Sequence, residues 1–197
     1  MQRPPQRSLE LTDPRALRAL AHPTRLKLLA LLRSVGPLTA SQAAERTGES
    51  AGSCSFHFRQ LARWGLCEEA GGGHGRERPW RATAASTSWS DAGASDEMAE
   101  ASHIFSRTIA EGYHESFLHW LDTRGREPLA WLEAANFGDV LLYVTPEELR
   151  ETVQAVRQAL ESVARRTAER QIPHPGARMV QFIAMGFPID DKDPRHA

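Results

Sequence analysis

The sequence predicts a mainly helical α+β protein, in which a group of short helices with one β-hairpin precedes a helical domain with a few short strands. Apolar residues recur with helical spacing through residues 14–63, between proline and glycine stops. The glycine-rich stretch 71–75 then separates two short runs with strand character. Two long amphipathic segments, residues 95–124 and 145–170, complete the pattern.

Length and composition limit the class of protein. The chain has 197 residues, of which 41% are hydrophobic and 25% charged, as in globular proteins of one or two domains. No apolar run is long enough to cross a membrane, and the N-terminus has no apolar signal core. Two cysteines, Cys54 and Cys67, are too few for a disulfide framework. We therefore expect a cytoplasmic protein without a membrane partner.

Charge is divided unevenly along the chain. Residues 1–83 hold 13 Lys and Arg against 7 Asp and Glu, a net charge of +6. Residues 84–197 hold 11 against 18, a net charge of -7. An asymmetry of this kind favours contact between the basic half and a polyanion, with chance drift of surface charge as the alternative.

Local signals mark the starts of the first four helices. Pro14 and Pro23 suit the first positions of the first two. The N-cap candidates are Thr12 or Asp13, Thr39 with Gln42 as its capping-box partner, and Ser50. The third and fourth helices, joined by a tight turn, form a helix-turn-helix unit, and the hairpin that follows makes it a winged helix.

These signals divide the chain into five parts. We expect a flexible tail (residues 1–12), a winged helix domain (13–84), a linker (85–94), a dimerisation and effector domain (95–189) and a second flexible tail (190–197). Within the fourth part, residues 139–144 and 178–188 have strand character. The helix that begins after Thr145 carries a narrow apolar seam of Leu149, Val153, Val156, Leu160 and Val163.

The stretch "LRALAHPTRLKLLALLRSVGPLTASQAAERTGESAGSCSFHFRQLARWGLCEE" resembles the winged helix domain of ArsR-type bacterial transcriptional repressors. This stretch and the ArsR-type domain share the leucine-rich "ALAHPTRL" helix and the spacing of Ser55, His57, Leu61, Gly65 and Leu66. The resemblance covers residues 13–83. The rest of the chain is similar to the C-terminal extensions of many actinobacterial relatives.

The resemblance implies a homodimeric repressor that binds palindromic double-stranded DNA through the helix at 50–64 and the wing at 70–79. The DNA-binding candidates are Ser50, Ala51, Gly52, Ser53, Ser55, Phe56, His57, Arg59, Arg63, His74, Arg76 and Arg78. Phe56 either touches a thymine methyl group or packs on the neighbouring helix. His57 contacts phosphate or makes a buried hydrogen bond. Arg25 and Lys27 are further phosphate candidates.

Other functions are weighed against this one. The first is a winged helix that binds proteins and not DNA. The second is a metal-responsive regulator using His103 and His114, whose companion positions Ala101 and Phe117 cannot ligate. We expect no metal, no cofactor and no catalytic site, since no catalytic motif is present. A small-molecule effector of the C-terminal domain is left open.

Overall fold

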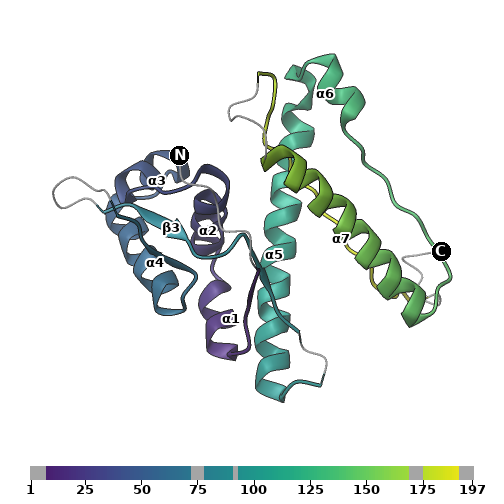
Figure 1. Ribbon diagram of the computed structural model, residues 1–197, viewed down its shortest axis with the longest axis horizontal. Coiled ribbons are helices and arrows are strands. Elements are labelled where there is room, and N and C mark those ends of the chain that lie inside the picture. Colours follow the sequence, from purple (N-terminus) through teal and green to yellow (C-terminus); the bar gives the residue numbers. More distant parts are fainter. Residues whose placement is uncertain (1–7, 72–77, 91–92, 169–174, 191–197) are drawn as a thin grey trace. The chain divides into compact units, whose positions relative to one another are not determined.

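The computed structural model describes residues 8–71, 78–90, 93–168 and 175–190. Its fold is mainly helical, as the sequence predicts (Figure 1). The chain forms two compact units, residues 1–125 and 126–197, and each is described by itself. Among the described residues, no helix has the length and apolar character needed to cross a membrane.

Four short helices form the centre of the first unit: α1 (Pro14–Leu20), α2 (Pro23–Val35), α3 (Ala40–Thr47) and α4 (Ala51–Arg63). The N-caps of α1 and α4 are Asp13 and Ser50, whose side chains accept hydrogen bonds from backbone N–H groups in the first turn. Thr39 and Gln42 form the expected capping box at α3. The capping prediction is therefore confirmed at these three helices.

The hairpin consists of β2 (Cys67–Glu69) and β3 (Trp80–Ala82), which pair antiparallel. Trp80 also exchanges backbone hydrogen bonds with Leu38, at 2.8 and 3.0 Å, so the hairpin is fixed to the start of the helix-turn-helix unit. The tip between the strands lies outside the described residues.

A second strand pair joins the two ends of this domain. β1 (Ser8–Glu10) pairs parallel with β4 (Ser86–Ser88), and the Leu11 N–H donates to the Ser88 carbonyl at 2.9 Å. The sequence places residues 8–11 in a flexible tail and 86–88 in a linker, whereas the structure orders both. Leu11 is only 5% exposed and belongs to the core. Pairing between such distant segments has no local turn signal, which explains the difference.

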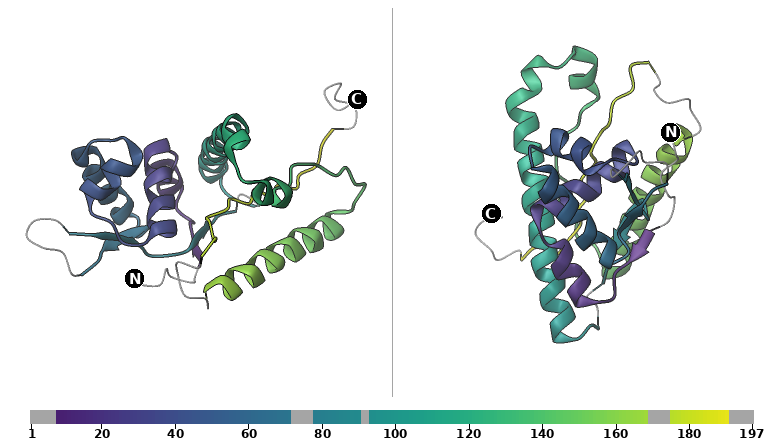
Figure 2. Two further views of the ribbon diagram at one scale, coloured as in Figure 1. Left: turned by 90° about the horizontal axis from the view of Figure 1, so that it is seen from above. Right: turned by 90° about the vertical axis from the view of Figure 1, so that its left-hand side faces the viewer.

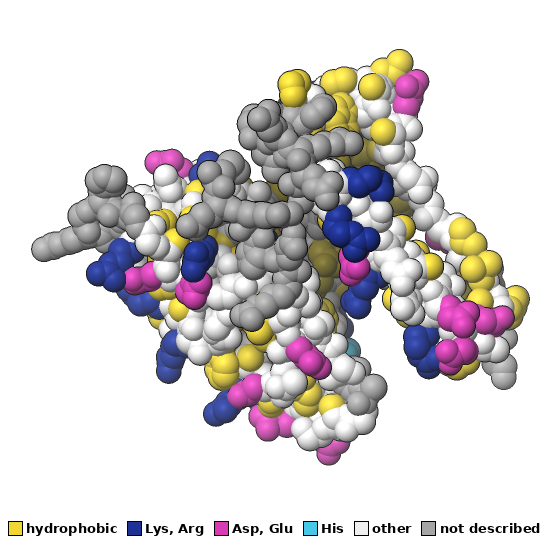
Figure 3. Space-filling view, in the orientation of Figure 1, with side chains coloured by type: hydrophobic (Ala, Val, Ile, Leu, Met, Phe, Trp, Pro, Cys, Tyr) yellow, Lys and Arg dark blue, Asp and Glu magenta, His cyan; other side chains and the backbone are white. Residues whose placement is uncertain are grey.

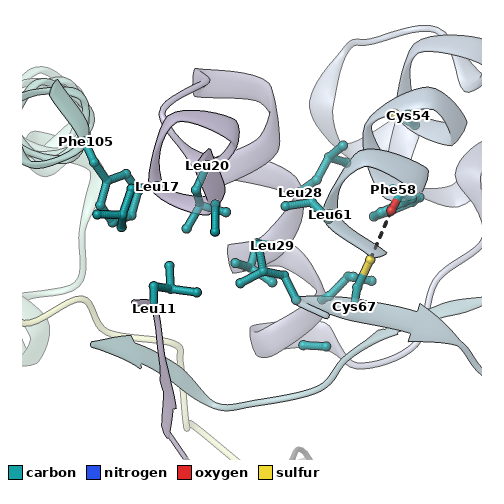
Figure 4. Packing of buried hydrophobic residues seen from close by; sticks show 14 of the residues in the cluster. Leu11, Leu17, Leu20, Leu28, Leu29, Cys54, Phe58, Leu61, Cys67 and Phe105 are labelled. Atoms are coloured by element: carbon teal, nitrogen blue, oxygen red, sulfur yellow. Dashed lines mark hydrogen bonds between the residues drawn. The ribbon is translucent and has the colours of Figure 1, made fainter. Parts of the chain in front are cut away.

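The long helix α5 (Asp96–Thr123) packs its first half on α1 and is continued by the 3-10 turn η1 (Arg124–Arg126) (Figures 1 and 2). Ser95 caps it as predicted. Phe105 is fully buried and points toward Leu17 of α1 (Figure 4). The sequence assigns this helix to the second domain, but its first half completes the core of the first unit.

The second unit contains α6 (Leu129–Ala134) and α7 (Pro146–Ala168). The capping box of Thr145 and Glu148 is present, with the Glu148 N–H 3.3 Å from Thr145 Oγ1. The strands predicted at 139–144 and 178–188 are absent, because neither segment pairs with a neighbour among the described residues. None of the described residues of this unit is buried.

Candidate nucleic-acid interface

The helix α4 presents two different faces, as its sequence predicts. Cys54, Phe58 and Leu61 are buried in the core. Of the predicted site residues on this helix and at its cap, five side chains are exposed and two are half-buried: Ser50, Ala51, Phe56, Arg59 and Arg63 are exposed, and Ser53 and Ser55 are half-buried. Gly52 is exposed as well. The outer face is thus small and polar in its first turn, where backbone N–H groups favour anions, and it is cationic in its second half, at Arg59 and Arg63.

Hydroxyl groups on this face already have partners. The Ser50 hydroxyl accepts from the Ser53 N–H at 3.1 Å, and the Ser53 hydroxyl donates to Glu49 at 3.1 Å. Arg59 Nη1 donates to Ser55 Oγ at 3.3 Å. These are exposed or half-buried contacts, so a phosphate oxygen can replace them at modest cost.

Glu49 is a residue that the sequence reasoning missed. Its carboxylate accepts from Thr24 on α2 at 3.1 Å and from Ser53 on α4. This acid therefore connects the start of α2 to the first turn of α4. It also places a negative charge beside the exposed N-terminus of α4, which would otherwise favour an anion. The signal available in the sequence was an acid directly before the Ser50 cap.

Phe56 is an exposed aromatic residue on the outer side of α4. It is 49% accessible and touches the ring of His57 edge-on, with the ring centroids 5.3 Å apart. Phe56 therefore contributes an apolar contact surface in the middle of a polar helix face.

His57 is buried, at 8% exposure, and its ring lies 4.7 Å from the ring of His22 at the start of α2. Nδ1 of each ring has no hydrogen-bond partner among the described residues. Burial, followed by the neighbouring His22 and Arg25, lowers the pKa of His57. His57 thus belongs to the buried side of α4, and it lacks the buried hydrogen bond that was one of its two predicted roles.

The wing residues fall into two groups. His74 and Arg76 lie outside the described residues. Arg78 is exposed and donates to Glu69 at 2.8 Å, and the adjacent rung pairs Arg81 with Glu68. Glu69 raises the pKa of Arg78. The described part of the hairpin is therefore close to neutral, although exposed pairs of this kind exchange readily for phosphate.

Six described cations of residues 8–90 have no ion pair within that part of the chain, and all six lie on helices. Within the described part of residues 8–90, Arg15, Arg18, Arg78 and Arg81 pair with acids. No ion pair within that part is formed by Arg25, Lys27, Arg33, Arg46, Arg59 and Arg63, all of which lie on α2, α3 or α4. Figure 3 shows the mixture of basic and acidic side chains on one face of this unit.

Arg33 and Arg25 differ from the other four, because burial lowers the pKa of both guanidinium groups. Arg33 Nε donates to the Ala84 carbonyl at 3.0 Å, and burial lowers the pKa of Arg33 to about 10. Arg33 thus holds the chain after β3 against α2, whereas Lys27, Arg46, Arg59 and Arg63 are exposed. Arg46 was not among the predicted site residues, because nothing in its sequence context separates it from an ordinary solvated arginine.

The helices, their turn and the first hairpin strand correspond to a known type of domain. Residues 20–69 match a family described as a helix-turn-helix domain. This part of the chain is a helix-turn-helix domain. No curated protein matches the chain. The match covers α2, α3, α4 and β2, and so includes most of the predicted DNA-binding residues.

Metal ligation finds no support around this domain. Among the described residues, no three or more His, Cys, Asp or Glu side chains are grouped so that they could hold a metal ion. His103 and His114 are exposed on α5, and α3 contains no cysteine.

Proposed function

We propose that the chain is a homodimeric transcriptional regulator of the ArsR type, which binds palindromic double-stranded DNA through α4 and the wing. One observation carries the proposal: the helix-turn-helix domain exposes Lys27, Arg46, Arg59 and Arg63, and none of the four has an ion-pair partner among the described residues. Exposed cations without an acidic partner suit a backbone of phosphates.

The residues of α4 take separate roles in this proposal. Arg59 contacts a guanine edge or a phosphate, since it projects from the exposed face and its one hydrogen bond within the described part of the chain is to Ser55. Ser53 and Ser55 bind phosphate oxygens, and Phe56 packs on thymine methyl groups. Lys27 on α2 and Arg46 on α3, both exposed, add phosphate contacts.

A matching second half-site requires a second copy. In helix-turn-helix dimers the two recognition helices enter successive major grooves, about one helical turn apart. The protein therefore recognises an imperfect palindrome, and an effector would act by changing the distance between the two α4 helices.

The second candidate is a winged helix that binds proteins. Two observations favour it: Phe56 exposes an apolar ring, and Glu49 and Glu69 place acids on the surface that DNA would meet. An acidic or mixed protein surface also suits such a face.

Binding to a random-sequence duplex at rising salt separates the two functions. The logarithm of the DNA association constant should fall linearly with the logarithm of the salt concentration, because each phosphate contact releases counterions. Replacing Lys27 and Arg46 by Ala should make this dependence less steep, whereas Arg150→Ala, on an exposed helix of the second unit, should leave it unchanged. Salt-independent binding, or no binding, would favour the protein-binding candidate.

A further inference from the structure

Two segments of the second unit are extended and lack backbone partners. Residues 139–144 lead into α7, and residues 178–188 follow it. Neither segment makes a backbone–backbone hydrogen bond within the described part of the chain. Exposed peptide groups in extended conformation are templates for pairing with another strand. Both segments also have the strand character that the sequence predicts.

Contacts with the helices show that the two segments run in the same direction. Where the second segment begins, Arg178 pairs with Glu127 and lies 5.2 Å from the ring of Trp131, next to α6. Where it ends, a Cβ on Gly186 would lie 3.2 Å from Leu149 in the first turn of α7. The first segment also starts after α6 and ends at α7. The arrangement is thus an extended segment, a helix and a second extended segment that runs parallel to the first (Figure 1). Parallel strands are joined by a crossover helix in the same way.

The side chains of these segments are apolar on both faces. Alternate residues of the second segment include Met179, Ile183, Met185 and Phe187 on one side and Val180 and Phe182 on the other. All of them are exposed, as are Val140, Leu141, Leu142, Tyr143 and Val144 in the first segment. Figure 3 shows hydrophobic side chains exposed on this unit. A strand that is apolar on both faces is typical of the interior of a covered sheet.

Neither segment has a pairing partner among the described residues. The strands β1 to β4 form two separate pairs, both within the first unit, and neither segment joins them. A second copy supplies the same two segments, and a two-fold axis pairs equivalent strands antiparallel. The α7 helix of each copy would then pack on the same sheet.

We propose that residues 139–144 and 178–188 form an intersubunit β-sheet with the same segments of a second copy of this chain. The proposal rests on the homodimer of the proposed function and assigns it a second contact, away from the helix-turn-helix domain. It accounts for strand-forming sequences that stay unpaired in a single chain, and for a unit whose described residues are all at least partly exposed.

The test is photo-crosslinking of the full chain without DNA. A photoreactive phenylalanine analogue replaces Phe182, and this chain is mixed with an isotopically heavy copy that lacks it. We expect crosslinked peptides that join a light chain to a heavy chain within 139–144 or 178–188. Crosslinks confined to one chain, or intersubunit crosslinks only to other regions, would overturn the proposal. DNA binding is measured in a separate experiment, so a failure of the proposed DNA-binding function can be distinguished from a failure of the proposed intersubunit sheet.

A matched pair of variants tests the role of the backbone. Val180→Pro removes one N–H from the segment, whereas Val180→Ala shortens the same side chain and keeps the N–H. Hydrogen exchange should be slow in residues 139–144 and 178–188 of the parent dimer and of Val180→Ala. It should be at least tenfold faster in Val180→Pro. Equal exchange rates in the two variants would contradict strand pairing.

Discussion

The two units of the molecule differ in how they use their apolar residues. The first encloses a continuous core of leucines, Phe58 and Phe105. The capped helices α1, α3 and α4 contribute residues to this core. The second has equally well-formed helices and caps, yet its described residues include no buried side chain. Good local signals are therefore sufficient for helices in both units, but only the first contains the tertiary partners that a core needs.

The largest effect should come from truncating one aromatic residue in each unit. Phe58 is fully buried and stacks on Trp80, so Phe58→Ala should lower the free energy of unfolding by about 3–5 kcal/mol. Phe187 is exposed, and Phe187→Ala should change it by less than about 0.5 kcal/mol in dilute monomer. Urea titration measures both, and comparable losses would show that the second unit has its own core.

A smaller contrast is expected at the two capping boxes. Thr39→Ala removes the cap of α3, which packs on α4, and should destabilise the first unit by about 1 kcal/mol. Thr145→Ala removes the cap of α7 and should reduce helix content without shifting the main unfolding transition. Circular dichroism and urea titration together distinguish the two results. A shift of the main transition by Thr145→Ala would mean that the units unfold as one.

Two neighbouring histidines, the half-buried His22 and the buried His57, should make the stability of the first unit depend on pH. Burial lowers the pKa of both His22 and His57 in the folded chain, so the unfolded chain binds protons more readily. The neutral form of these two rings therefore stabilises the folded chain fully above about pH 6.5, the ordinary pKa of histidine. This stabilisation is lost as the pH falls below that value. Glu49 opposes the shift and Arg25 adds to it.

Thermal unfolding between pH 7.5 and 5.5 measures this effect. The double variant His22→Gln, His57→Gln should have a smaller loss of stability across this range. His103→Gln, at an exposed position of α5, serves as the control and should behave as the parent does. A parent whose stability does not change with pH in this range would contradict the lowered pKa of the two rings.

The smallest effect on stability is expected at the hairpin. The pair of Arg78 and Glu69 is exposed, so Arg78→Ala should leave the unfolding transition where it is. DNA affinity should nevertheless fall if the wing contacts phosphate. A variant that loses stability and not DNA affinity would make Arg78 a structural residue.

Sequence reasoning succeeded where the signals were local. The capping boxes at Thr39 and Thr145, the cap at Ser50 and the buried positions on α4 follow from residues within one or two turns of each other. The helix-turn-helix domain was predictable for the same reason, since short segments with strong signals define it.

The failures involve contacts between distant segments. Residues 8–10 pair with residues 86–88, and no turn signal in the sequence predicts this pairing because the segments are far apart in the chain. The strands expected at 139–144 and 178–188 need neighbours that a single sequence does not identify. Glu49 was missed because its role depends on Thr24, which lies 25 residues away in the chain.

The central claim is that the exposed face of α4 holds DNA, and the affinity of Arg59→Ala for a duplex selected from a random pool tests it most directly. Arg107→Ala, on the exposed side of α5, is the matched control. We expect the dissociation constant of Arg59→Ala to rise about tenfold or more, as for a lost base or phosphate contact, and that of Arg107→Ala to match the parent. Equal affinities for all three proteins would contradict the claim.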